Sequence, residues 1–417
     1  MSKLTHHDLI TLLLAISVML IVSRIVAEAG KKIGLPMVMG ELVVGIGLGP
    51  TIFGSIAPAA HEALFPLATN ANVSLSLDAI TSLSVIMLLF VTGLEVRLPL
   101  VLKQGKIAIT TGLGGMILPF ITGFAVAWLF PGLFASPASG ARHTIFALFL
   151  GTALSISALP VIARILLDMN MLKNEIGMTV LAAAILNDLV GWIVFSFILS
   201  MAGQGGAAFS LNHTIFAIAA FASFMLVIGR FIINQILPWA QTSLSWPGGV
   251  LSFSLGLGLL CAAFTEAIHL HAILGAFIAG IAIGDSVHLR EQAREIMHQF
   301  VTNFFAPLFF VSIGLKVNFL RHFDPTIVAI VLALAFLGKT AGAGLGARAG
   351  GMPWRQALTI GSGLNARGAM EIILGTLAFE AGIIQQPVLV ALIVMALITS
   401  VTSAPMMRYF LRSPTAG

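Results

Sequence analysis

Four ionisable residues lie deep within long apolar stretches of this 417-residue sequence: Asp188, Lys339, Arg367 and Glu371. An ionisable side chain at the centre of a bilayer costs a few kcal/mol, so such residues are rare and mark ion or proton pathways. Among the 16 acidic residues, Asp188 and Glu371 are the two that we place deepest. A carboxylate in such surroundings can bind a proton or a small metal cation, and this is the chemistry that the pattern indicates.

The neighbours of Asp188 favour a role in ion binding. Ala184 and Gly191 share its helix face, because residues three and four apart are adjacent on a helix, and both are small enough to leave space for an ion and water. Asn187 adds an amide that can donate to the carboxylate or to a backbone carbonyl. The alternative is an aspartate held neutral, or paired with Lys339, only to hold helices together. Lys339 needs a carboxylate or a helix C-terminus as its partner, and Asp188 is the first candidate.

Two further apolar stretches predict helices that are interrupted near their centres. Residues 144–167 contain Thr152, Ser155 and Ser157, followed by a proline that removes a backbone donor. Residues 356–378 contain three glycines between residues 361 and 371, together with the pair Arg367 and Glu371, spaced four apart. Interrupted helices at corresponding positions of two halves indicate a transporter binding site, where carbonyls and hydroxyls act as cation ligands. Arg367 and Glu371 form either a purely structural ion pair or a direct part of that site.

The elements that must position these residues are predicted to be transmembrane helices. The chain is 58% hydrophobic and only 9% charged, against about 25% charged residues in a soluble domain. Because a helix needs about 20 apolar residues to cross a bilayer, the sequence accommodates about thirteen spans and predicts an all-α membrane protein. We place them near 9–27, 33–49, 79–94, 107–131, 144–167, 176–201, 212–236, 248–268, 272–284, 300–316, 326–349, 356–378 and 386–411.

The basic residues predict the orientation of the chain. Most of the 21 lysines and arginines fall in one set of alternating loops, and the other set holds only Lys3, Arg142, Lys316 and Arg321. The positive-inside rule then places the N-terminus outside and the C-terminus in the cytoplasm, in a cell (inner) membrane. This distribution also accounts for the net charge of +5 without a nucleic-acid partner.

Sequence echoes between the two halves predict an inverted repeat. Three glycines of the second span match three of the ninth: Gly40, Gly45 and Gly49 with Gly275, Gly280 and Gly284. Residues 90–96 match residues 310–317 with one inserted residue, and residues 151–155 match residues 361–365. Each match is displaced by seven spans, and an odd displacement reverses the direction of a helix through the membrane. We therefore expect a single transporter unit with repeats at 1–201 and 248–411 and a linker helix at 212–236.

A buried carboxylate of this kind predicts exchange by competition. A bare anion is costly to move across a low-dielectric barrier, whereas a carboxylate neutralised by a proton or by a metal cation can cross. It cannot hold both well. The site would then return loaded from either side, so that one cation is exchanged for protons without further chemistry.

The sequence resembles the monovalent cation/proton antiporters of the Kef, Nap and Nha type over nearly its whole length. The resemblance rests on seven stretches: Leu35 to Pro50, 90–95, 155–164, Asn187-Asp188, 275–280, Gly338-Lys339 and 365–371. It implies a core domain at about 79–201 and 300–378, in which two broken helices cross, and a dimerisation domain formed by the remaining helices. It also implies elevator-type movement, a homodimer in membrane lipid, Asp188 as the shared carrier, Thr152 and Ser155 near the ion, and Lys339 as the core lysine.

One departure from the family pattern leaves the stoichiometry open. Strongly electrogenic relatives have two aspartates where this chain has Asn187 and Asp188. One carboxylate predicts one proton per cation, but Lys339 is the residue type of the electrogenic group and could itself release a proton. The Kef-type systems also carry a cytosolic nucleotide-binding domain, and we expect none in this chain. The cation is expected to be Na⁺, with K⁺ possible, and no cofactor is expected.

A symporter and an intramembrane enzyme are the alternatives to exchange. A sodium-coupled symporter of organic anions on a similar inverted-repeat fold would need an organic-substrate cavity beside its cation sites. An intramembrane aspartyl protease would need two intramembrane aspartates and a zinc protease a His-Glu-x-x-His motif, and neither pattern is found in the spans. Gly361-Ser362-Gly363 lacks the glycine two residues before the serine that a rhomboid-type site would have. The single cysteine, Cys261, excludes a disulfide framework and a thiolate metal site. We therefore expect a transporter and not an enzyme.

Overall fold

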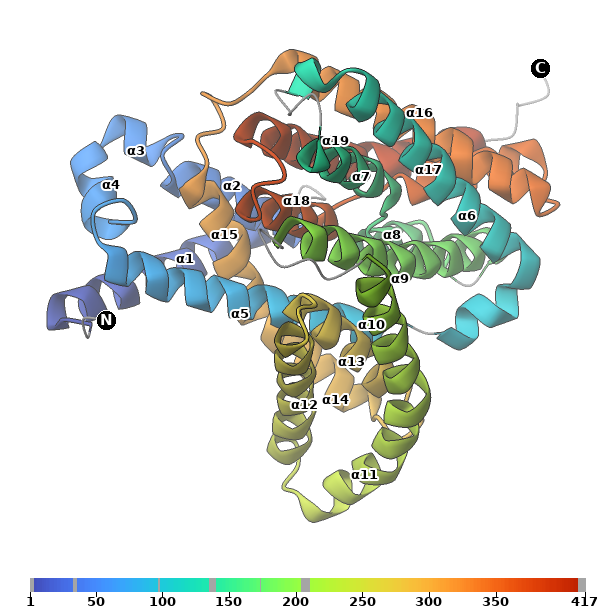
Figure 1. Cartoon of the computed structure of the whole chain (residues 1–417), viewed down its shortest axis with the longest axis horizontal. Coiled ribbons are helices and arrows are strands. Elements are labelled where there is room, and N and C mark those ends of the chain that lie inside the picture. Colours follow the sequence, from blue (N-terminus) through green and yellow to red (C-terminus); the bar gives the residue numbers. More distant parts are fainter. Residues whose placement is uncertain are drawn as a thin grey trace. The chain divides into compact units, whose positions relative to one another are not determined.

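The computed structural model describes residues 4–32, 36–96, 98–134, 140–172, 174–203 and 211–411 (Figure 1). Lys3 and Leu35, which entered the sequence predictions, lie outside these residues. Within the described ranges every regular element is helical. This agrees with the predicted all-α class, because a chain in lipid must satisfy each backbone polar group internally.

The chain folds into two compact units, each built from two separate segments. The first unit comprises Met1–Val96 and Ala219–His322, and the second comprises Arg97–Ile218 and Phe323–Gly417. These boundaries differ from those expected for a core domain at 79–201 and 300–378, since residues 79–96 and 300–322 belong to the first unit. The assignment of core and dimerisation roles stays a prediction.

The first unit contains the first five helices of the chain and those from residue 224 to residue 316. They are α1 (His6–Lys32), α2 (Met37–Leu48), the short α3 (Phe53–Ile56) and α4 (Pro58–Leu64), α5 (Ala71–Glu95), a π-helical turn (Phe224–Gly229), α11 (Arg230–Ser243), α12 (Gly248–Ala267), α13 (Ala272–Gly284), α14 (Glu291–Phe300), a second π-helical turn (Val301–Phe305) and α15 (Ala306–Lys316). Helix α10 (Leu211–Ser223) runs across the boundary between the segments of the two units.

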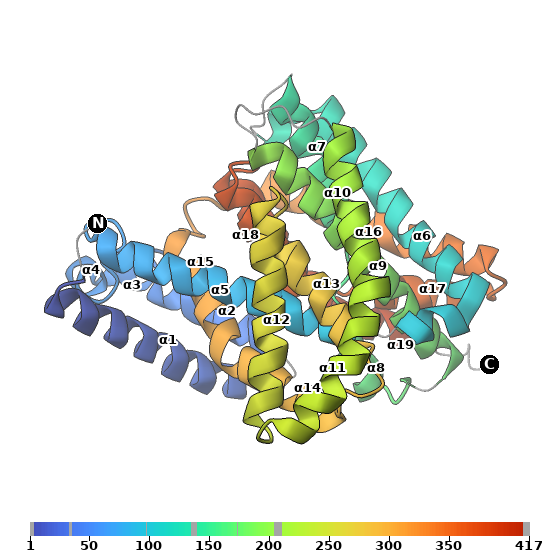
Figure 2. The same ribbon diagram turned by 60° about the horizontal axis from the view of Figure 1, so that its bottom comes forward.

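The second unit contains all the predicted site residues. Its helices are α6 (Leu98–Leu129), a 3₁₀ turn (Pro131–Phe134), α7 (Ala141–Ser155), α8 (Leu159–Asp168), α9 (Glu175–Gly203), α16 (Pro325–Ala349), α17 (Trp354–Leu364), α18 (Ala369–Glu380) and α19 (Gln386–Leu411). Helix α6 packs along α16 (Figures 1 and 2).

The lengths of the helices fit a multi-pass membrane protein. In the described part of the chain, eleven helical segments are long and apolar enough to cross a membrane, and each overlaps one predicted span. The two remaining predicted spans fall on α13, which is a shorter apolar helix, and on the pair α17 and α18. The number thirteen stays a prediction, because these two segments fall short of a single continuous crossing helix.

The packing within each unit follows a paired pattern. In the first unit α2 packs against α15 and α5 packs against α13; in the second, α6 packs against α7 and α16 packs against α17. A displacement of seven spans relates the contact of α2 with α15 to that of α13 with α5, and the contact of α6 with α7 to that of α16 with α17. This is the pattern expected of a two-fold related repeat, and the repeat itself stays a prediction.

Matched glycines lie where these helices cross in the first unit. A β-carbon on Gly45 would lie 2.5 Å from the carbonyl oxygen of Val311, and one on Gly314 would lie 2.0 Å from the carbonyl carbon of Gly45. The matched pair behaves alike, since a β-carbon on Gly280 would lie 2.1 Å from the carbonyl oxygen of Phe90. Backbones approach this closely only where a residue lacks a side chain.

We expect Gly45→Ala to lower the free energy of unfolding by about 1–3 kcal/mol, because the added methyl group forces α2 and α15 apart. The matched control is Gly47→Ala in the same helix, since a β-carbon there meets nothing within 4 Å. Thermal unfolding of both purified variants in one detergent, followed by tryptophan fluorescence, measures the difference. Equal unfolding midpoints for the two variants would contradict the close crossing.

Candidate functional site

Asp188 lies in α9 with no exposed surface. The contacts of nearby residues show which segments lie against the face of α9 that carries Asp188. A β-carbon on Gly191 would lie 2.4 Å from Cγ1 of Ile156, and one on Gly363 would lie 3.5 Å from Cγ1 of Val180. Val180, Asp188 and Gly191 are spaced eight and three residues apart, so they lie along one stripe of the helix. Asp188 is therefore on the side of α9 that faces the segments after α7 and at the end of α17.

Those segments are the ends of two helices that meet. Helix α7 ends at Ser155 and α8 begins at Leu159, while α17 ends at Leu364 and α18 begins at Ala369. The connecting residues are hydrogen bonded to each other: Ser157 Oγ donates to the carbonyl of Leu364 at 2.9 Å, and the Ala158 N–H donates to the carbonyl of Ala366 at 3.1 Å. The chain leaves its helical path before Pro160, which occupies the first turn of α8, where a proline costs no hydrogen bond.

Two cationic side chains close the C-terminal end of α7. Lys339 Nζ donates to the carbonyl of Ser155, and Arg367 donates to the carbonyls of Ala153 and Leu154 at 2.7 and 2.5 Å. Both side chains are completely buried. The last carbonyls of a helix carry a partial negative charge and lack intrahelical donors, so cations at this end satisfy both requirements.

Asn187 connects Lys339 to the helices around it. With its side-chain nitrogen directed at the carbonyls of Gly112 and Ala183, at 2.9 and 3.2 Å, its oxygen accepts a hydrogen bond from Lys339 Nζ at 3.1 Å. Lys339 is thus held by a backbone carbonyl and by the residue next to Asp188. The predicted pairing of Lys339 with Asp188 itself stays a prediction.

The three predicted hydroxyl residues are buried, and each donates its proton to a backbone carbonyl. Thr152 donates to Leu148 at 2.8 Å within α7, and Ser155 donates to Gly151 at 2.7 Å and to Met116 of α6 at 2.9 Å. A hydroxyl whose proton is engaged in this way presents only lone pairs to its other neighbours. The oxygens of Thr152, Ser155 and Ser157 are accordingly suited to accept a hydrogen bond or a cation.

Arg367 and Glu371 form a buried ion pair, with Arg367 Nη1 at 3.3 Å from Glu371 Oε2 and both side chains at most 1% exposed. Arg367 lies in the connection before α18, and Glu371 lies in the first turn of that helix. The pair therefore links the interruption to α18 instead of lying within one continuous helix. Ser400 of α19 donates to the carbonyl of Arg367 and fixes the connection from the other side.

The structure brings most of the predicted residues into one network and adds groups that the sequence did not indicate. Ser155, Asn187, Lys339, Arg367 and Glu371 are joined through the hydrogen bonds and the ion pair given above, Ser157 bonds to the end of α17, and Thr152 is one helical turn from Ser155. Sequence reasoning missed the carbonyls of Gly112 and Met116 on α6, because a backbone acceptor leaves no trace in residue type. It also gave no role to Asn365, although the repeat matches this residue with Ser155.

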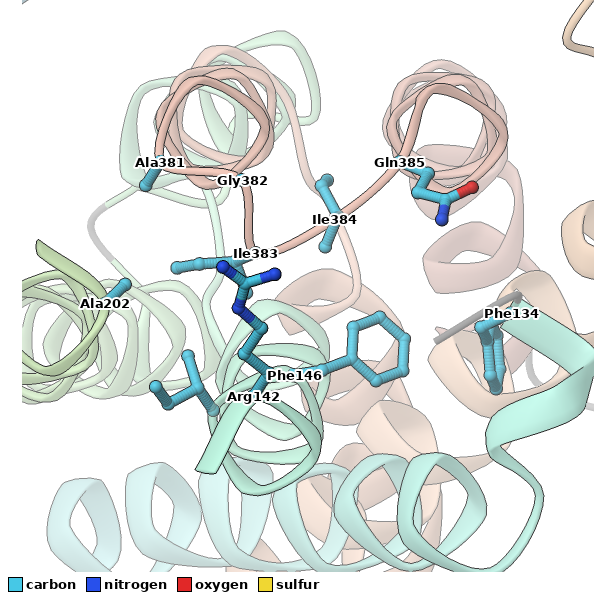
Figure 3. A pocket seen from close by; sticks show the side chains of 10 residues that line it. Phe134, Arg142, Phe146, Ala202, Ala381, Gly382, Ile383, Ile384 and Gln385 are labelled. Atoms are coloured by element: carbon cyan, nitrogen blue, oxygen red, sulfur yellow. The ribbon is translucent and has the colours of Figure 1, made fainter. Parts of the chain in front are cut away.

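A cavity of about 310 Å³ lies elsewhere in the second unit (Figure 3). Apolar side chains such as Ile145 and Phe146 line it together with Arg142 and the loop from Ala381 to Gln385. In Figure 3 the Arg142 guanidinium points toward Ile383 of that loop. None of the residues in the site network lines this cavity.

Comparison with known proteins adds an independent observation. A family model described as the transmembrane sodium/hydrogen exchanger matches residues 16–409. The chain belongs to the sodium/hydrogen exchanger family. The resemblance seen in the sequence is thereby confirmed, because the matched region includes all the motifs on which it rests.

Relatives of this exchanger-family chain have similar names. It is 29% identical over 409 residues to Cation/H(+) antiporter 17 of Arabidopsis thaliana, covering 96% of this chain and 48% of that protein. It is 28% identical over 403 residues to Na(+)/H(+) antiporter NhaS4 of Synechocystis sp., covering 96% and 97%. The chain spans about half the length of the plant relatives and nearly all of the cyanobacterial one.

A solved structure supports the fold. The sodium proton antiporter MjNhaP1 from Methanocaldococcus jannaschii matches 96% of this exchanger-family chain and 96% of its own, with a TM-score of 0.67 and 16% sequence identity. At that identity the likeness establishes a shared architecture for the two chains and nothing about the ion.

Proposed function

We propose that this protein is a secondary active antiporter that exchanges a monovalent cation for protons by competition at Asp188. The observation that carries the proposal is a completely buried carboxylate on α9, one helical turn from Gly191, which lies against Ile156 in the connection between α7 and α8. The family membership supports it, as do the names of relatives such as the Na(+)/H(+)-K(+) antiporter GerN of Bacillus cereus, which is 28% identical over 396 residues.

The surroundings of Asp188 explain how one group could bind two cargoes in turn. Lys339 and Arg367 are both held by carbonyls at the end of α7, and Arg367 is further neutralised by Glu371. Their charges are therefore largely engaged by groups of the protein, and we propose Asp188 as the carboxylate at which the transported ion binds. When it is ionised, a dehydrated cation is stabilised by the carboxylate and by nearby hydroxyl oxygens; when it is protonated, the same space has no charge to offer.

Coupling follows from the cost of moving an uncompensated charge. A lone carboxylate in a low-dielectric barrier is strongly unfavourable, so only the proton-loaded and cation-loaded forms cross. We propose that the crossing is an elevator-type movement of the site-bearing helices. One proton per cation is the expected stoichiometry if Lys339 keeps its proton throughout the cycle, and a larger ratio is expected if Lys339 releases it.

The cation is proposed to be Na⁺, with K⁺ as the second candidate. Hydroxyl, amide and carboxylate oxygens bind both ions, and the choice between them depends on the size and rigidity of the cavity. Relatives are named for both, as in the K(+)/H(+) antiporter 1 of Saccharomyces cerevisiae, which is 29% identical over 383 residues. We further propose an inner-membrane homodimer with its N-terminus outside, contributing to ion and pH homeostasis.

Transport in vesicles tests the proposal. The purified protein is reconstituted with an internal acidic gradient reported by a quenched dye, and NaCl, KCl, LiCl or choline chloride is added across a pH series. We expect dequenching with an alkali cation and none with choline. The alternative, a sodium-coupled symporter, predicts sodium-driven uptake of a bile-acid-like anion without dequenching, and that result would refute exchange.

A further inference from the structure

Asn365 is a buried polar residue whose side-chain amide makes no hydrogen bond among the described residues. It is the residue directly after α17 and has no exposed surface. Among the described residues, neither the oxygen nor the nitrogen of its side chain has a hydrogen-bond partner. Leaving a buried polar group unpaired is costly, so buried amides in folded proteins are nearly always paired. An unpaired amide beside a transport site therefore indicates a ligand that binds it in part of the cycle.

Asn365 lies close to the residues around Asp188. The carbonyl of the preceding residue, Leu364, accepts the hydrogen bond from Ser157 Oγ, and this Ser157 oxygen lies 3.5 Å from the side-chain amide of Asn187. The hydrogen bond and this contact lead from the end of α17 to the neighbour of Asp188. Gly363, two residues before Asn365, lies against Met407 of α19 and Val180 of α9.

The ends of α7 and α17 differ in how their negative charge is compensated. At α7 the carbonyls of residues 153–155 accept from Lys339 and Arg367, so two fixed cations occupy that end. At α17 the bonds described come from neutral groups, the Ser157 hydroxyl and the Ala158 N–H. A helix C-terminus carries roughly half a negative charge, and at α17 this charge remains to attract a mobile cation.

The repeat makes this contrast more informative. Residues 151–155 match 361–365, so Asn365 occupies the position of Ser155. The Ser155 hydroxyl shares its one proton between the carbonyls of Gly151 and Met116, and its own carbonyl accepts from Lys339. The two matched positions have thus diverged, because the side chain of Asn365 has no hydrogen-bond partner among the described residues.

We propose that the transported cation binds between Asp188 and the C-terminal end of α17, with Asn365 Oδ1 as one of its oxygen ligands. This inference rests on the proposed exchange function and assigns a second ligand to it. Asp188 supplies the charge for which proton and cation compete. Asn365 supplies an oxygen that the proton does not need, so it favours the cation-loaded form over the protonated one.

Two readouts on Asn365→Ala test the proposal. In the vesicle assay we expect the apparent KM for the preferred cation to rise about ten-fold or more, since a hydrogen bond or ligand to a charged group is lost, while the rate at saturating cation stays within about two-fold. In detergent we expect NaCl or KCl, compared with choline chloride at equal ionic strength, to raise the unfolding midpoint of the wild type and to raise that of Asn365→Ala much less. Ser362→Ala is the matched control, because this hydroxyl in α17 donates to Leu358 at 2.8 Å within its own helix.

Asn365→Ser covers the case in which the alanine variant does not fold, because it keeps a side-chain oxygen and is expected to give an intermediate KM. An unchanged KM and an unchanged cation-dependent midpoint in Asn365→Ala, or in Asn365→Ser where only that variant folds, would overturn the role of Asn365 while leaving exchange intact. A KM that rises equally in Ser362→Ala would also overturn it. Failure of the wild type to exchange any of the cations would instead refute the proposed function on which this inference rests.

Discussion

Asp188→Asn is expected to reduce cation-dependent dequenching to the level of protein-free vesicles for every cation and at every pH. The amide has nearly the shape of the carboxylic acid, so the packing of α9 is preserved. It can neither release a proton nor balance the charge of a metal cation, and both halves of the exchange are lost together. Because Asp188 is completely buried, bulk solvent cannot substitute for the missing charge.

The control for this experiment is Asp168→Asn in α8. Its carboxylate pairs with Arg164 at 3.1 Å, and both side chains are more than half exposed, so its loss should leave transport unchanged. Thermal unfolding midpoints close to that of the wild type would show that both variants fold. Normal turnover in Asp188→Asn would disprove exchange by competition at this residue, whichever cation is used.

Arg367→Met is expected to lower the free energy of unfolding by about 3–5 kcal/mol, which is the usual cost of removing one partner from a buried ion pair. Glu371 would be left charged and buried without its cation, which lies 3.3 Å away in the wild type. The carbonyls of Ala153 and Leu154 would also lose their donors. The interruption between α7 and α8 depends on these bonds, so transport should fall with stability.

Two further variants separate the charge from the fold. Arg367→Gln combined with Glu371→Gln removes both charges while keeping polar side chains, and we expect it to recover part of the lost stability. Arg164→Gln breaks an exposed pair and should change the unfolding midpoint little, because surface ion pairs contribute about 0–1 kcal/mol. Equal midpoints for Arg367→Met and Arg164→Gln would mean that the buried pair does not stabilise the fold.

The fold was largely predictable because the bilayer restricts the possible elements so strongly. Long apolar runs such as residues 325–349 had to be helices, and their spacing fixed the order of the elements. The grouping of helices into units was harder, since residues 79–96 resemble site-bearing helices in hydropathy. It depends on where glycines such as Gly93 and Gly280 let backbones approach, which a count of apolar residues does not reveal.

The candidate site residues could also be chosen from the sequence, but their hydrogen-bond contacts could not. Asp188 and Lys339 stood out because charge is rare in these stretches. The contacts of Lys339 with a Ser155 carbonyl and with Asn187 could not be predicted, because backbone acceptors are present at every residue. The sequence points to Pro160 as the cause of the break, whereas α7 ends at Ser155, five residues before that proline.

The interleaved make-up of the two units has a consequence for biosynthesis. Each unit combines an early and a late segment of the chain, so α5 leaves the ribosome almost two hundred residues before its packing partner α13. Until then its glycine face has only lipid, or another unfinished helix, to contact. We expect nascent chains stopped before α13 to be sensitive to membrane proteases, and assembly to begin only late in translation.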